Sequence, residues 1–111
     1  MNDNPIVIAD AEGRIRHWDA AAEAAFGHPA DAAIGRTLDL IVPPEHREAH
    51  WRGFHRAMAS GVAAAEGQVA PFPVRLANGV VEPRQARLAL VREPGGRPIA
   101  AMVVFAARPG A

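Results

Sequence analysis

The segment from Ile6 to Arg36 constrains the fold most, because its pattern changes from strand to turn to strand within a few residues. Residues 6–8 are a run of Ile and Val, which is typical of a β-strand. The run stops at the turn sequence Asp-Ala-Glu-Gly, where Gly13 supplies the positive φ that a tight turn requires. Residues 14–18 then alternate polar and apolar side chains, as a half-buried strand does. The sequence therefore predicts a β-hairpin near the start of the chain.

A short capped helix is predicted directly after the hairpin. The Asp19 side chain can accept a hydrogen bond from a free backbone N–H at the start of residues 20–26, and Glu23 is placed to reach back into the first turn. Gly27 ends this helix. Residues 28–35 predict a second, shorter helical turn that ends in a glycine.

The longest predicted helix covers residues 45–59. It opens after Pro43 and Pro44, and Glu45 and Glu48 lie in its first turn, where negative charge favours the helix dipole. Its end is marked by the Ser-Gly pair at residues 60–61. The residues just before it, 37–42, predict a semi-extended apolar segment.

The rest of the chain predicts three strands joined by Asn-Gly and Gly-Gly turns of the hairpin type, at residues 68–76, 80–91 and 98–107. Pro71 and Pro73 lack backbone N–H donors, so the first of these strands is interrupted or lies at a sheet edge. Residues 99–105 are almost wholly apolar, which predicts a central strand covered on both faces.

The composition limits what the chain can do. Its 111 residues suffice for one domain with a single core, expected to span residues 1–111 with its folded part at about 4–106. Basic and acidic residues number 12 each, so no basic field attracts nucleic acid or an anionic membrane. The absence of cysteine excludes disulfides, a thiolate nucleophile and a cysteine metal site. No apolar run reads as a membrane span or signal peptide, which predicts a cytoplasmic protein.

Enzyme chemistry has little support in the sequence. Ser60, the only serine, stands beside Gly61 at the end of the long predicted helix, which is a capping position. Neither paired carboxylates in an apolar cleft nor a glycine-rich phosphate loop can be identified. His46 and His50 have a zinc-compatible spacing, but His-Arg-Glu-Ala-His lacks the metalloprotease arrangement. We therefore expect neither an enzyme nor a zinc site.

Several motifs occur together in an order that resembles the PAS domain family. They are Asp-x-x-Gly, the segment Trp-Asp-x-Ala-Ala-Glu-x-x-Phe-Gly, Ile-Gly-Arg, and the entry to the long helix, Leu-Ile-Val-Pro followed by Glu45 and Arg47. Ala-Asn-Gly at residues 77–79 and Pro-Gly-Gly at residues 94–96 fall at the later hairpins of that family. The resemblance implies an α+β PAS fold, in which a five-stranded antiparallel sheet with helices on one face encloses a ligand pocket.

One face of the long predicted helix is apolar and carries a histidine. A rotation of 100° per residue brings five side chains onto this arc: His50, Trp51, Phe54, Ala57 and Met58. The other side carries or borders Glu48, Arg52, Arg56 and Ser60. Helix geometry alone allows His50 to be a boundary residue bonded to a backbone carbonyl, because a histidine on an apolar face needs a partner.

The resemblance extends to the oxygen-sensing haem branch of the PAS family, whose axial histidine lies on the same helix. It implies that His50 ligates the iron of haem b and that Arg56 reaches a haem propionate. Phe54 and Met58 would line the pocket, and the apolar distal wall would comprise Ala65, Ala86 and Leu88. Ala70 occupies the position of that branch's oxygen-binding arginine. This leaves Gln68 or Arg75 as substitutes, or favours CO and NO over O2.

Two other functions fit the same sequence. The first is a cofactor-free dimerisation module, its pocket filled by Phe54, Met58, Leu88 and Met102. The second is a pocket for a small apolar or carboxylate metabolite, anchored by Arg56 or Arg75.

The later strands carry more apolar residues than one buried face needs, so some must face outward. We expect that face to pair with a second copy or with an output domain such as a histidine kinase. His17, His28 and His55 are expected at the surface.

Overall fold

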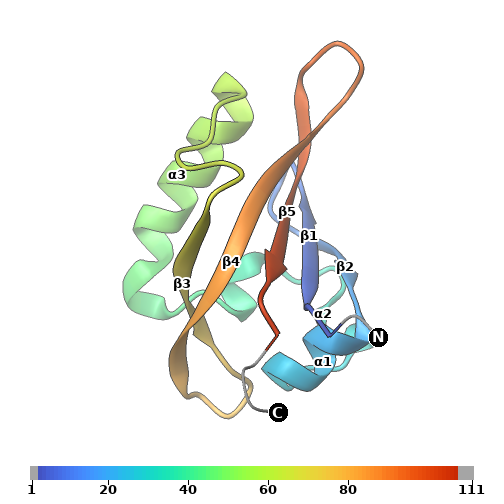
Figure 1. Ribbon diagram of the computed structural model, residues 1–111, viewed down its shortest axis with the longest axis vertical. Helices are drawn as coiled ribbons and strands as arrows, with labels where there is room; N and C mark the ends of the chain where they lie inside the picture. The colour runs from blue at the N-terminus through green and yellow to red at the C-terminus, as the bar shows by residue number, and fades with distance from the viewer. Residues whose placement is uncertain (1–2, 108–111) are drawn as a thin grey trace.

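The computed structural model describes residues 3–107 and contains one antiparallel sheet of five strands in the order β2-β1-β5-β4-β3 (Figure 1). The strands are β1 (Ile6–Asp10), β2 (Ile15–Trp18), β3 (Val69–Arg75), β4 (Val81–Arg92) and β5 (Pro98–Phe105). The first and last strands of the chain pair at the centre, with Val7 opposite Val103. The predicted hairpins and the central place of the last strand are therefore confirmed.

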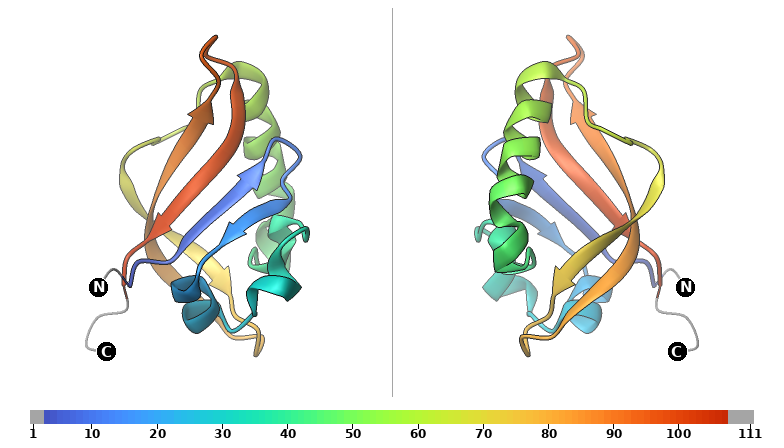
Figure 2. Two further views of the ribbon diagram at one scale, coloured as in Figure 1. Left: turned by 90° about the vertical axis from the view of Figure 1, so that its right-hand side faces the viewer. Right: turned by 90° about the vertical axis from the view of Figure 1, so that its left-hand side faces the viewer.

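The helical segments form a single layer on one face of the sheet. They are α1 (Ala20–Phe26), α2 (Ala30–Ala33), the 3-10 turns η1 (Leu38–Leu40) and η2 (Pro44–His46), and α3 (Arg47–Ser60). Figure 2 shows the sheet in front of α3 in one view and behind it in the opposite view. This arrangement confirms the predicted fold class.

The predicted caps of α1 are partly confirmed. Asp19 accepts a hydrogen bond from the Ala22 N–H at 2.8 Å, and Gly27 ends the helix with a φ of 89°. The prediction for Glu23 is wrong, because its carboxylate accepts a hydrogen bond from the Ala30 N–H instead of reaching back into the first turn of α1. The turn at Gly27 brings the start of α2 close to Glu23, whose side chain satisfies a free N–H there.

The segment before α3 also departs from its prediction. Residues 37–42 were expected to be semi-extended, but the turn η1 lies within them, and both Leu38 in this turn and Ile41 directly after it are buried. Side chains three residues apart lie on the same side of a 3-10 turn, so this conformation buries two apolar residues that an extended chain would point to opposite sides. A second 3-10 turn, η2, delays the start of α3 to Arg47.

The core lies between the helical layer and one face of the sheet. Its buried members include Phe26, Phe54 and Phe105, and the Phe26 and Phe105 rings meet edge to face at 5.0 Å between centroids. Pro71 and Pro73 lie on β3, which is the edge strand that these prolines predicted.

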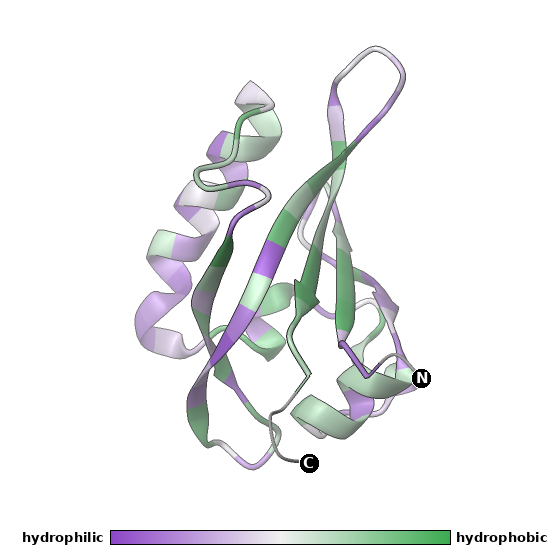
Figure 3. Cartoon of the chain, in the orientation of Figure 1, coloured by the Kyte–Doolittle hydropathy of each residue, from purple (hydrophilic) through white to green (hydrophobic). Residues whose placement is uncertain are grey.

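The expectation that β5 is covered on both faces is wrong. Ala101 and Phe105 point into the core, whereas Met102 and Val104 lie half-buried on the opposite face. Figure 3 shows that β1 and β5 are hydrophobic along most of their length. A single helical layer protects only one side of an apolar strand.

A tryptophan on α3 joins three parts of the structure. The Trp51 Nε1–H donates to Asp39 Oδ1 in η1 at 2.7 Å. Its ring lies so close to the turn between β1 and β2 that a Cβ built on Gly13 would stand 2.3 Å from two ring carbons. Gly13 also has a φ of 83°, which side chains disfavour. This position therefore accepts only glycine.

We predict that Gly13→Ala destabilises the fold by about 2–4 kcal/mol, because the strain of a left-handed alanine adds to overpacking against Trp51. Gly79→Ala is the matched control, because Gly79 has a φ of 89° and nothing lies within 4 Å of the added Cβ. It should cost only about 1–2 kcal/mol. Urea unfolding of both variants measures the difference. Equal losses would show that Trp51 does not constrain this turn.

Candidate functional site

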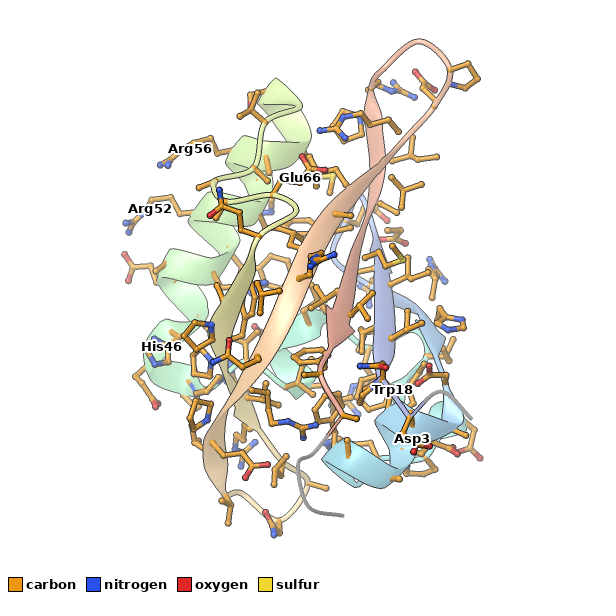
Figure 4. The ribbon with its side chains drawn as sticks, viewed as in Figure 1. Asp3, Trp18, His46, Arg52, Arg56 and Glu66 are labelled. Atoms are coloured by element: carbon orange, nitrogen blue, oxygen red, sulfur yellow. The ribbon has the colours of Figure 1, made fainter. Side chains whose placement is uncertain are left out.

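The apolar face predicted for the long helix is confirmed in α3. Phe54 and Ala57 are buried, and His50, Trp51 and Met58 are half-buried. Arg52 and Arg56 are exposed, and Figure 4 shows both side chains turned away from the sheet. The helix thus presents its histidine and its arginines in different directions.

His50 lies among aromatic rings without a hydrogen bond to its inner nitrogen. Its ring centroid is 4.8 Å from that of Trp51 and 6.1 Å from that of Phe54. Nδ1 is buried and has no partner, so the alternative of an Nδ1 bond to a backbone carbonyl is not realised. Burial lowers the pKa of His50 despite the opposing charge of Asp39, and His55 lowers it further. The imidazole is therefore neutral at neutral pH.

The residues predicted to surround haem lie in different places. Phe54, Met58, Ala86 and Leu88 meet in the core, where they pack as parts of one hydrophobic cluster. Ala65 is exposed in the loop between α3 and β3 with a φ of 59°. The neutral imidazole of His50 suits an iron ligand, but these packed side chains and the outward Arg56 do not form a haem site in this conformation. Haem ligation by His50 stays a prediction.

A second candidate site lies at the other end of the helical layer. A cleft of about 360 Å³ opens between the segment after α2 and the end of β3. Its charged and titratable lining residues are His28, Arg36, Asp39, Arg47 and Arg75, and we call it the arginine cleft. The sequence predicted Arg75 only as an alternative anchor and gave no signal for Arg36. No local pattern joins two arginines that lie so far apart along the chain.

His28 was expected at the surface, but it is half-buried beside this cleft. Its Nε2 is buried without a hydrogen-bond partner. Burial lowers the pKa of His28, and the positive charges of Arg36 and Arg75 lower it further. The neighbouring Trp18 donates its Nε1–H to the backbone carbonyl of His28 at 2.9 Å, which holds this residue in place.

Two charged residues of the cleft neutralise each other. Arg47 donates through Nη2 to the backbone carbonyl of Asp39 at 3.0 Å, and its Nε lies 3.7 Å from the Asp39 carboxylate. Arg47 Nε also donates to the Val42 carbonyl at 3.1 Å. Within residues 3–107, Arg36 and Arg75 have no ion pair. The cleft therefore carries an excess of positive charge.

Residues 3–107 contain neither a membrane-spanning helix nor a cluster of metal-ligating side chains. No helix within residues 3–107 is long and apolar enough to cross a membrane. In the same range no three histidine, aspartate or glutamate side chains gather as a metal site would require. His46, the potential partner of His50 in a zinc pair, is exposed near the foot of α3 (Figure 4).

Comparison with known proteins identifies the fold family. The family described as "PAS fold" matches residues 2–108, so the chain belongs to the PAS family. A curated protein of Azorhizobium caulinodans, described as uncharacterized, is 31% identical over 99 residues, which cover 88% of this chain and 14% of that protein. The chain thus corresponds to a small part of that relative's length.

Solved PAS domains have the same architecture. The PAS domain of a protein from Colwellia psychrerythraea superposes with a TM-score of 0.79 at 15% identity, covering 99% of this chain and 90% of that one. The PAS domain of the Cronobacter turicensis RpfR quorum-sensing receptor, solved in complex with C12:0, gives a TM-score of 0.75 at 18% identity, with coverages of 96% and 95%. At these identities the similarity shows the fold alone.

The lowered pKa values of His28 and His50 predict a loss of stability in acid. Both lie below the ordinary value of 6.5, so below about pH 6.5 the unfolded chain binds more protons than the folded one. The free energy of unfolding should therefore fall as the pH drops through this range. Urea unfolding between about pH 7 and pH 5 measures the slope. His50→Gln should flatten it, whereas His17→Gln, at an exposed site, should not. Equal slopes in wild type and His50→Gln would contradict this assignment.

Proposed function

We propose that this PAS domain is a sensory and signalling module that acts through its uncovered sheet face, which pairs with a second copy of the chain. Membership of the PAS family supports a sensory role, because PAS domains are typically sensory modules rather than enzymes. The observation that carries the proposal is the apolar character of the residues that point to the sheet face opposite the helices.

We call this surface the outer face, and define it by half-buried residues on three neighbouring strands: Ile6, Ile8, Ala89, Val91, Met102 and Val104. Met102 lies at its centre, opposite Ile8 on one side and Ala89 on the other. Its margin is polar, with the ion pair between Asp10 and Arg16 on one side and exposed Arg87 on the other. An apolar centre with a polar margin is the usual composition of a protein interface.

The uncovered outer face also explains why the later strands carry more apolar residues than one buried face needs. The apolar residues predicted to exceed one buried face divide between the two sides, with Leu88, Leu90, Val103 and Phe105 inside and Val91, Met102 and Val104 outside. Val81 and Ile99, which belong to the same predicted set, are exposed. Exposed apolar side chains on adjacent strands cost solubility unless a partner covers them. Contact with a second copy removes them from water and gives the domain a route for its signal.

We predict that Met102→Glu weakens self-association at least tenfold, because a charge at the centre of the outer face would lose its hydration in the dimer. Ala59→Glu, at an exposed position on α3, is the matched control and should leave self-association unchanged. Light scattering and sedimentation over a range of protein concentrations measure both. A wild-type protein that stays monomeric throughout, or equal effects of the two variants, would overturn the proposed pairing.

A haem-based gas sensor is the second candidate, and the neutral, half-buried imidazole of His50 supports it. Haem binding would require the core side chains beside α3 to rearrange. When bound, haem would supply an iron atom that takes a diatomic gas, and His50 would hold that iron.

The haem candidate predicts a strong Soret band after reconstitution of the purified protein with haem. His50→Ala should abolish stoichiometric haem retention, because the protein would lose its iron ligand. His46→Ala removes an exposed histidine one helical turn away and should bind haem as the wild type does. No Soret band in the wild type, or equal binding by His50→Ala, would exclude His50 as the iron ligand.

A further inference from the structure

We propose that the arginine cleft is a binding site for a small organic dianion, held by the guanidinium groups of Arg36 and Arg75. The site is separate from the outer face and from the core side of α3, because it lies between the segment after α2 and the end of β3. It would give the domain a chemical input that does not depend on haem.

Positive charge is concentrated in the arginine cleft. The chain as a whole carries no net charge, yet three arginines and only one carboxylate line this cleft. Arg47 is held by Asp39, which leaves the positive charges of Arg36 and Arg75 without an acidic partner in the described part of the chain. Arg36 and Arg75 are both exposed and line one concave space, so their like charges together attract an anion to it. Two guanidinium groups match two negative charges.

Two polar groups at the cleft, on His28 and Thr37, lack hydrogen-bond partners within residues 3–107. The buried His28 Nε2 has no partner, although a buried polar atom is rarely left without one. The Thr37 hydroxyl also lines the cleft and makes no hydrogen bond within residues 3–107. The Thr37 hydroxyl can donate a hydrogen bond to an oxyanion in the cleft. His28 Nε2 is closed off from solvent, so it can donate to such an oxyanion only after its ring turns toward the cleft. A carboxylate or phosphate oxygen accepts hydrogen bonds from donors of this kind.

The dimensions and walls of the cleft define the size of the ligand. A volume of about 360 Å³ suits a molecule of a few carbon atoms. Leu40 and Leu76 line the cleft beside the charged groups, so an uncharged carbon chain can lie against them. Dicarboxylates and phosphate monoesters share this chemistry, which is a compact body with two negative charges.

Calorimetric titration of the full chain tests the site with three probes. Succinate represents dicarboxylates, glycerol phosphate represents phosphate monoesters, and neutral succinamide has the size of succinate without its charge. We expect at least one charged probe to bind and succinamide not to bind. Whichever charged probe binds more tightly identifies the source of the ligand. Saturable binding should weaken with added salt, because the contacts are between charges.

Variants assign the binding to the cleft. Arg36→Gln and Arg75→Gln should each weaken binding at least tenfold, and Arg75→Lys should restore part of the loss. Arg97→Gln is the matched control, because Arg97 is an exposed arginine between β4 and β5 and is part of neither the cleft nor the outer face. Equal unfolding temperatures would show that each variant folds. Failure of wild type to bind either charged probe, equal loss in Arg97→Gln, or equal binding of succinamide would overturn the proposal.

Discussion

The hydrogen bond from the Trp51 indole to the Asp39 carboxylate is the contact on which the arrangement of the helical layer depends. It ties α3 to η1, while the same ring packs against the turn between β1 and β2. A bond from a neutral donor to a carboxylate contributes about 1.5–3 kcal/mol in a half-buried place. Because α3 buries only Phe54 and Ala57 fully, this polar contact determines where along the sheet the helix lies.

The same carboxylate determines the charge of the arginine cleft. Asp39 accepts the Trp51 bond and pairs with Arg47, so it is not free to neutralise other arginines. Some arginines of the protein have acidic partners, as Arg92 has Glu66 at 2.8 Å, whereas Arg36 and Arg75 have none within residues 3–107. Their charges are therefore not offset by an ion pair. An occupant of the cleft would contact the pair that also holds α3, which offers a physical route from the cleft to the helix.

The two faces of the sheet differ although their strands are similar in composition. The helices are too few to form a second layer. Alternate side chains along β1, β4 and β5 are therefore buried beneath the helices, and the side chains between them point to the uncovered face. This asymmetry follows from the alternation of side chains along a strand. It leaves the outer face available for a partner. His50 lies beside the Trp51 ring on α3, and the arginine cleft lies at the end of the helical layer. The three surfaces are therefore separate.

Local signals in the sequence determined the elements and their order. The Asp19 cap, the Gly27 end, the apolar arc of α3, the prolines of β3 and the PAS motifs each act over a few residues, and the structure confirms them. Tertiary contacts decided what those signals could not. The partner of Glu23 lies seven residues away, beyond the turn at Gly27. The placement of His28, Arg36 and Arg75 around one cleft depends on segments far apart in the chain. Side-chain pairing across such distances is set by which carboxylate and which carbonyl the fold brings within reach, and no local pattern records it.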